Sequence, residues 1–206
     1  MAFVSNGTTI LDAGAFSASL GAMTLIKTLT ASSSATVSFV NGSSNVVLDS
    51  TYPIYVVKII SANIQTDNQD IVVNFSDDTS SHSYNLTKTD SYFAALHTEA
   101  DNDAGLQYEA AEDTAQGTGF TVVTKEQAND ADAGACSTIF LFNPSSTTFV
   151  KHYMMRSNWF QHNNYAQDAF KSGYINTTAA VTAIQFKSTS GNIDSGTFKL
   201  YGIKDS

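Results

Sequence analysis

The chain has 206 residues, enough for one domain or two small ones, and carries 10 Lys+Arg against 19 Asp+Glu, a formal net charge of -9. This acidity excludes the basic surface that nucleic-acid binding requires, so we expect no nucleic-acid partner. No apolar run approaches the roughly 20 residues of a bilayer span, so we expect no membrane insertion. The first residues lack the basic and apolar regions of a signal peptide, which predicts assembly in the cytoplasm. A single cysteine, Cys136, excludes an intramolecular disulfide scaffold.

The composition favours an all-β fold with weakly charged surfaces. Charged residues make up 14% of the chain, while Ser and Thr supply roughly a quarter of it. Such a surface is typical of subunits that neighbouring copies cover, and it indicates a homo-oligomer. The chain also contains 13 Phe and 9 Tyr together with many β-branched residues, which favour strands over helices.

Residues 1–22 show no clean period and predict a non-globular N-terminal arm, followed by a β-sandwich domain over residues 23–206. The arm contains scattered apolar residues among Gly, Ser and Thr. We expect these apolar residues to pack on a neighbouring subunit: Phe3, Val4, Ile10, Leu11 and Phe16.

Alternating patterns predict strands along the rest of the chain. The first two, 24–29 and 35–40, flank a serine-rich turn and suggest a hairpin. Residues 99–112 are acidic and Ala-rich and are compatible with a long loop or one short helix, of which we expect the loop. The pair 137–142 and 148–156 flanks Asn-Pro-Ser-Ser and forms the clearest predicted hairpin. Further strands are predicted at 54–60, 71–75, 92–96, 119–123, 173–175, 183–187 and 197–201.

With ten or eleven short strands, the pattern predicts a two-sheet β-sandwich of jelly-roll type. Residues 158–165 interrupt it with aromatic and amide side chains in an expected loop. Such a mixture suits a sugar-binding or protein-binding surface, and the alternative is that the aromatics cap the end of the sandwich or enter a subunit interface. The candidate binding residues there are Trp159, Phe160 and Tyr165.

Motifs for catalysis or metal binding are incomplete. Asp194-Ser195-Gly196 matches one aspartic-protease loop, but only one copy is present, and a turn explains it better. Residues 101–105 and 130–134 resemble the first half of a calcium loop without its full ligand set. The four histidines lack metal-site spacing. We therefore predict no catalytic, cofactor-binding or metal-binding residues and no enzyme.

Three C-terminal strings carry a resemblance to a known family: 141–152 (LFNPSSTTFVKH), 173–180 (GYINTTAA) and 190–203 (SGNIDSGTFKLYGI). Together with 24–28 and 31–35, they resemble virion structural proteins of tailed, often marine, bacteriophages. The resemblance extends over roughly 23–203 and offers no catalytic or ligand residues to carry over.

The resemblance implies a virion protein on the particle surface, and we expect a capsid decoration (cement) protein. Its partners would be its own copies, with a trimer expected, and the major capsid or tail proteins of the same virion. One alternative is a tail-fibre or receptor-binding subunit that holds a host surface glycan at 159–165. The other is a tail enzyme that degrades polysaccharide, which would need a pair of acidic residues.

Overall fold

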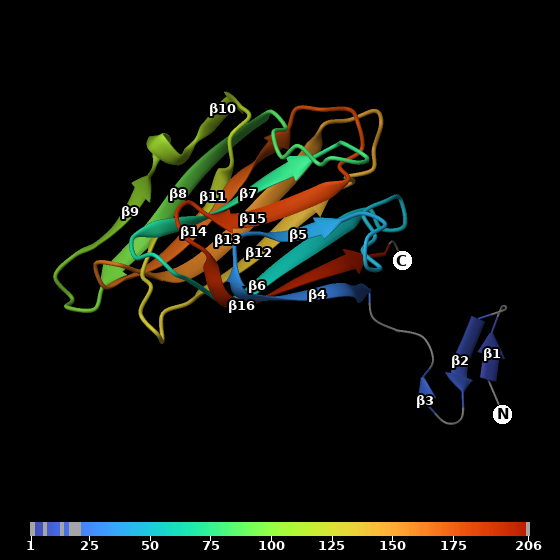
Figure 1. Ribbon diagram of the computed structural model, residues 1–206, viewed down its shortest axis with the longest axis horizontal. Coiled ribbons are helices and arrows are strands. Elements are labelled where there is room, and N and C mark those ends of the chain that lie inside the picture. The colour runs from blue at the N-terminus through green and yellow to red at the C-terminus, as the bar shows by residue number, and fades with distance from the viewer. Residues whose placement is uncertain (1–2, 6–7, 13–14, 17–21, 205–206) are drawn as a thin grey trace.

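The protein, described by a computed structural model over residues 3–5, 8–12, 15–16 and 22–204, is built almost entirely of antiparallel strands (Figure 1). This confirms the all-β prediction. One short 3-10 turn, η1 (Ala110–Glu112), interrupts the strands. No helix within these ranges has the length and apolar character needed to cross a membrane.

Thirteen strands form one continuous sheet that folds over into two layers and nearly closes into a barrel. The larger layer runs in the order β4 (Met23–Ser34), β16 (Ile193–Ile203), β6 (Ile54–Ile64), β12 (Ala135–Phe142), β13 (Lys151–Gln161), β14 (Tyr165–Ile175) and β8 (Lys88–Thr98). The far side of β8 pairs with β9 (Ala104–Tyr108) and β10 (Thr114–Gly117). The smaller layer runs β11 (Thr121–Gln127), β7 (Gln69–Ser76), β15 (Ala183–Ser188) and β5 (Val37–Val40).

The two layers are joined at one corner, where β11 pairs with β13 through Gln127 and Gln161. The predicted two-layer sandwich is therefore confirmed. Its jelly-roll type is not confirmed, because a jelly roll distributes eight strands over two Greek keys and this sheet has a different strand order.

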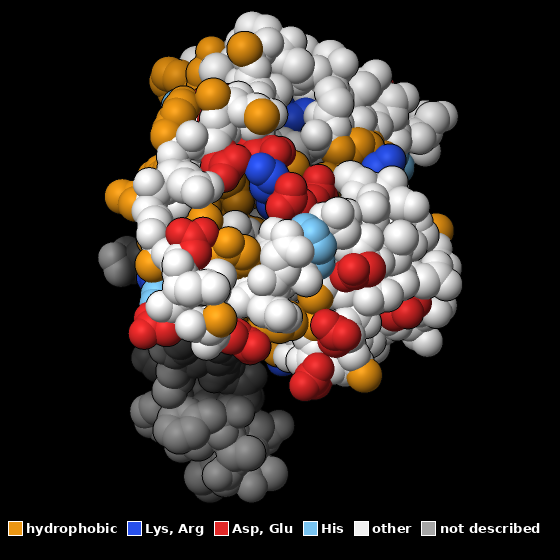
Figure 2. Space-filling view, turned by 90° about the vertical axis from the view of Figure 1, so that its left-hand side faces the viewer, with side chains coloured by type: hydrophobic (Ala, Val, Ile, Leu, Met, Phe, Trp, Pro, Cys, Tyr) orange, Lys and Arg blue, Asp and Glu red, His pale blue; other side chains and the backbone are white. Residues whose placement is uncertain are grey.

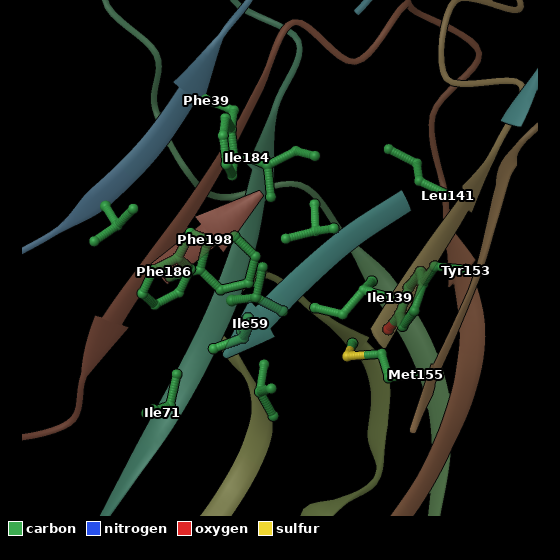
Figure 3. Packing of buried hydrophobic residues seen from close by; sticks show 14 of the residues in the cluster. Phe39, Ile59, Ile71, Ile139, Leu141, Tyr153, Met155, Ile184, Phe186 and Phe198 are labelled. Carbon is green, nitrogen blue, oxygen red and sulfur yellow. The ribbon is translucent and has the colours of Figure 1, made fainter. Parts of the chain in front are cut away.

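The core lies between the layers because alternate side chains on each strand point inward. On β13, every second residue from Lys151 to Gln161 is buried. Aromatic rings connect the layers: Phe75 of β7 lies 5.7 Å from Tyr153 of β13, and Phe186 of β15 lies 5.4 Å from Phe198 of β16, between ring centroids. Figure 3 shows Tyr153, Phe186 and Phe198 among the buried aliphatic side chains.

Two sequence predictions require correction. The strands over 24–29 and 35–40 exist but do not form a hairpin, because β4 pairs with β16 in the larger layer and β5 pairs with β15 in the smaller. Residues 99–112 are not a plain loop, since they contain β9 and η1. The hairpin of β12 and β13 is confirmed, with continuous pairing from Ala135–Trp159 to Leu141–Tyr153.

The N-terminal segment contains three short strands, β1 (Phe3–Ser5), β2 (Thr8–Asp12) and β3 (Ala15–Phe16). They form a separate antiparallel sheet. The expected arm thus has β-structure of its own, where we expected an irregular segment.

Candidate assembly surface

The outward side of the larger layer, which we call the outer face, carries a row of aligned side chains across neighbouring strands. Strand pairing aligns Thr138 of β12 with Arg156 of β13, then Phe170 of β14, Phe93 of β8 and Tyr108 of β9. Side chains in directly paired positions of antiparallel strands touch one another, so the row forms a continuous ridge.

Aromatic and cationic contacts fix the centre of this row. The rings of Phe93 and Phe170 stack with centroids 5.1 Å apart and an interplanar angle of 10°. The guanidinium carbon of Arg156 lies 4.9 Å from the Phe170 centroid, while its Nε and Nη2 donate to the carboxylate of Asp168 at 3.1 and 2.7 Å. The ion pair raises the pKa of Arg156 through its hydrogen bond to Asp168. The cation is thereby held over the ring of Phe170.

The outer face also exposes large apolar side chains to solvent. Met154 is 54% exposed and Leu106 is 75% exposed, and Ile60, Phe93 and Phe140 are exposed as well. A hollow of about 600 Å³ lies beside them, lined by Ile60, Phe140 and Arg156 among others. Exposed apolar patches of this kind mark interaction surfaces on soluble proteins.

The aromatic residues expected to bind partners at 159–165 lie on strands and not in the predicted loop. Residues up to Gln161 belong to β13 and those from Tyr165 to β14, so the expected loop is a tight hairpin. Trp159 is 2% exposed and its indole N–H donates to the carbonyl of Lys125 at 2.7 Å. Trp159 is therefore part of the core and cannot contact a partner, which corrects the prediction. Phe160 and Tyr165 are half-buried.

A second hollow of about 610 Å³ adjoins this hairpin. Its lining is rich in amide groups and includes the rim residue Tyr165, whose hydroxyl donates to Asp103 at 2.8 Å. The amides come from the turns that follow β8 and β13: Asn102, Asn163 and Asn164. Amides next to an aromatic ring can hydrogen-bond and stack with a sugar.

A cluster of charges surrounds Lys125 of β11. Its ammonium lies 2.8 Å from the carboxylate of Glu109 and 3.3 Å from that of Glu112. Burial alone would lower the pKa of Lys125, but the two carboxylates outweigh it and raise that pKa. Burial raises the pKa of the neighbouring Asp70. Figure 2, which looks onto the side where β9 and β10 lie, shows acidic side chains gathered around basic ones.

A second, fully buried polar network centres on Asp90 of β8. Its carboxylate accepts hydrogen bonds from the Tyr153 hydroxyl, from Thr121 Oγ1 at 2.9 Å and from the Thr114 backbone N–H at 3.0 Å. The ammonium of Lys171 lies 3.3 Å away. Burial lowers the pKa of Lys171, and Asp90 opposes that effect. These groups hold β8, β13, β14 and β11 together across the layers.

The remaining sequence motifs have structural roles in this fold. We expected Asp194–Gly196 to form a turn, but it is part of β16. There Asp194 accepts a hydrogen bond from the Ser33 hydroxyl. In the 101–105 segment, Asn102 and Asp103 bond with Thr98 and Tyr165. Among the residues that the structure describes, no three His, Cys, Asp or Glu side chains are grouped to hold a metal ion.

Of the arm residues, Val4 is 53% exposed. Backbone pairing places Phe3 opposite Leu11, and Leu11 opposite Phe16. Ile10 lies on β2 with Leu11. A role of these residues in attachment stays a prediction.

No protein-family model, curated protein or solved structure matches this chain.

Proposed function

We propose that this chain is a non-enzymatic structural subunit of a tailed-bacteriophage virion, displayed on the particle surface as a capsid decoration protein. It assembles as a homo-oligomer, for which we propose a trimer, and attaches to the major capsid protein. The observation that carries the assembly part of this proposal is the exposed apolar outer face, centred on the Phe93–Phe170 stack.

The chemistry of the outer face supports packing against another copy. Covering Phe93, Leu106 and Met154 removes apolar surface from water at about 25 cal/mol per Å². Arg156 and the aromatic pair beneath it offer the residue types that dominate binding energies in protein interfaces.

Sedimentation of the purified chain tests the assembly. We expect the natural sequence to sediment as an oligomer and a Phe93→Glu, Met154→Glu double variant to sediment as a monomer with an unchanged β circular-dichroism spectrum. Phe149→Glu is the matched control, because Phe149 is also an exposed large apolar residue but lies outside the strands, between β12 and β13. A natural sequence that stays monomeric at high concentration would refute the proposal.

Localisation on the particle tests the virion role separately. Electron microscopy with a labelled antibody is expected to mark the capsid surface. Deletion of residues 1–20 is expected to leave a folded sandwich that no longer attaches, if the apolar residues of the arm contact the capsid. Normal decoration by the truncated chain would show that the arm is not the attachment element.

A tail-fibre or receptor-binding role is the second candidate, and the amide-lined hollow at Asn102, Asn163 and Tyr165 favours it. Binding of host surface glycans that is lost in an Asn102→Ala, Asn163→Ala variant, together with antibody label on the tail, would support this role over decoration. Release of sugars from host envelope material by the pure protein would instead indicate the polysaccharide-degrading alternative.

A further inference from the structure

Asn74 and Lys88 face each other across the interior and belong to different layers of the sandwich. Asn74 lies on β7 in the smaller layer and Lys88 on β8 in the larger, and both are 0% exposed. The distance from Lys88 Nζ to Asn74 Oδ1 is 2.7 Å. A primary amine and a primary amide are thus held in contact where water does not reach them.

The amide of Asn74 is fixed by hydrogen bonds at both ends. Its Oδ1 accepts a second bond from the backbone N–H of Phe75 at 2.9 Å. Its Nδ2 donates to the carbonyls of Tyr84 at 2.6 Å and Thr118 at 3.0 Å. These bonds assign the oxygen and nitrogen of the amide and keep its carbonyl carbon, Cγ, next to the lysine.

Lys88 has no carboxylate within salt-bridge distance among the described parts of the chain, and besides Asn74 it donates to the carbonyl of Leu86 at 2.8 Å. Burial lowers the pKa of Lys88 to about 8, with the charge of Asp90 raising it and that of Lys171 lowering it further. A substantial fraction of the amine is therefore unprotonated in mildly alkaline solution, and an unprotonated amine is a nucleophile.

We propose that Lys88 and Asn74 form an intramolecular isopeptide bond that ties the two layers together. The lone pair of Nζ attacks Cγ, the Nζ–Cγ bond forms, and the carbonyl electron pair moves onto Oδ1. The carbonyl then re-forms and the Cγ–Nδ2 bond breaks. One proton passes from Nζ to Nδ2, and ammonia leaves. An amine and a primary amide thus become a secondary amide and ammonia, with no oxidant, reductant or cofactor.

The surroundings of Asn74 assist each part of this step. The backbone N–H of Phe75 donates to the oxygen that becomes negatively charged, as an oxyanion-hole donor does. The carbonyls of Tyr84 and Thr118 accept hydrogen bonds from the departing nitrogen as it gains its proton. The hydrogen bond to Oδ1 places Nζ near Cγ, because the oxygen and carbon of a carbonyl group are only about 1.2 Å apart.

Peptide mapping of the natural chain tests the proposal directly. A protease that cleaves before aspartate separates residues 70–76, which contain Asn74, from residues 78–89, which contain Lys88. After incubation at pH 9, we expect an intact mass lowered by one ammonia and these two peptides joined into one branched species. Two separate peptides would overturn the proposal, including when ammonia is lost, because a succinimide at Asn74 loses ammonia without joining them.

The sequence offers a matched internal control. Lys151 is also 0% exposed but donates to the backbone carbonyls of Ser146, Phe149 and Thr177, with no side-chain amide among these acceptors. Its peptides are expected to stay linear. The Lys88→Met variant is expected to have the mass calculated from its sequence, with no loss of ammonia. If that variant does not fold, the peptide map of the natural chain still tests the proposal.

The pH dependence provides a further check. Since only the neutral amine attacks, the rate of crosslinking is expected to rise about tenfold per unit below about pH 8 and then to level off. Joined peptides already complete in freshly purified protein would also support the proposal.

Discussion

The carboxylate of Asp90 lies 3.3 Å from the ammonium of Lys171, and the two side chains are 0% and 2% exposed, respectively. Together with the Tyr153 and Thr121 hydroxyls, they form a polar network inside an otherwise apolar core. Breaking one half of such a pair leaves the other charge buried without compensation.

Asp90→Asn is expected to reduce the free energy of unfolding by about 3–5 kcal/mol, because Lys171 would lose its counter-charge. Denaturant unfolding followed by fluorescence measures the change. Asp168→Asn is the control: its pair with Arg156 is largely exposed at Arg156, so we expect a loss of about 1 kcal/mol or less. Equal losses in the two variants would contradict the buried-pair interpretation.

The stability of the fold is expected to rise with pH through the titration of Lys171. Its folded pKa lies below the unfolded value near 10.5, so the unfolded chain binds more protons in the window between the two. Stability from this group is therefore lowest at low pH and is gained as the pH rises through the folded pKa. Unfolding curves from pH 7 to 10.5 should show a smaller increase in Lys171→Met than in the natural chain.

Gly173→Ala is expected to destabilise the sandwich by about 1–3 kcal/mol or more, because β8 lies too close for a side chain there. A Cβ at Gly173 would sit 2.2 Å from the carbonyl oxygen of Thr89 and 2.5 Å from Cβ of Asp90. Gly105→Ala is the control, since a Cβ at this glycine of β9 meets nothing within 4 Å. Thermal unfolding of both variants checks the contrast, and a neutral Gly173→Ala would show that the strands separate easily.

Trp159→Phe is expected to lower the free energy of unfolding by about 2–4 kcal/mol, because it leaves the Lys125 carbonyl without its indole donor and opens a cavity. Phe160→Leu, at the next and half-buried position, should cost about 1.5 kcal/mol or less. Denaturant titration separates the two. If Trp159→Phe impairs glycan binding without loss of stability, the core assignment of Trp159 is wrong.

Local sequence patterns predict those strands whose side chains alternate and whose ends carry turn residues. The strand containing 54–60 and the β12–β13 hairpin both have these signals, and both are confirmed. At 158–165 the alternation of buried and exposed side chains, which buries Trp159 and Gln161, is not recognisable from the sequence, because aromatic and amide residues occupy both kinds of position. The residue type Asn at position 164 is the signal that could have indicated a tight turn there, because Asn tolerates the left-handed region. In the structure Asn164 has a φ of 62°.

Pairing between distant strands could not be predicted from such patterns. The outer-face row depends on the register that places Phe93 of β8 opposite Phe170 of β14, residues on strands that are far apart in the sequence. The contact between Asn74 and Lys88 forms because β7 belongs to the smaller layer and β8 to the larger, so that their inward side chains meet in the core. Neither residue belongs to a sequence motif, so only the folded arrangement brings them together.

The position of β16 has a consequence for how the chain reaches this structure. β16 lies between β4 and β6, so a strand that is synthesised after both of its neighbours takes the second position from the edge of the larger layer. Until β16 emerges from the ribosome, the facing edges of β4 and β6 have no partner, and pairings this distant in sequence form slowly. A nascent chain therefore exposes two open strand edges until β16 is made, and unpaired edges of this kind favour aggregation with other chains.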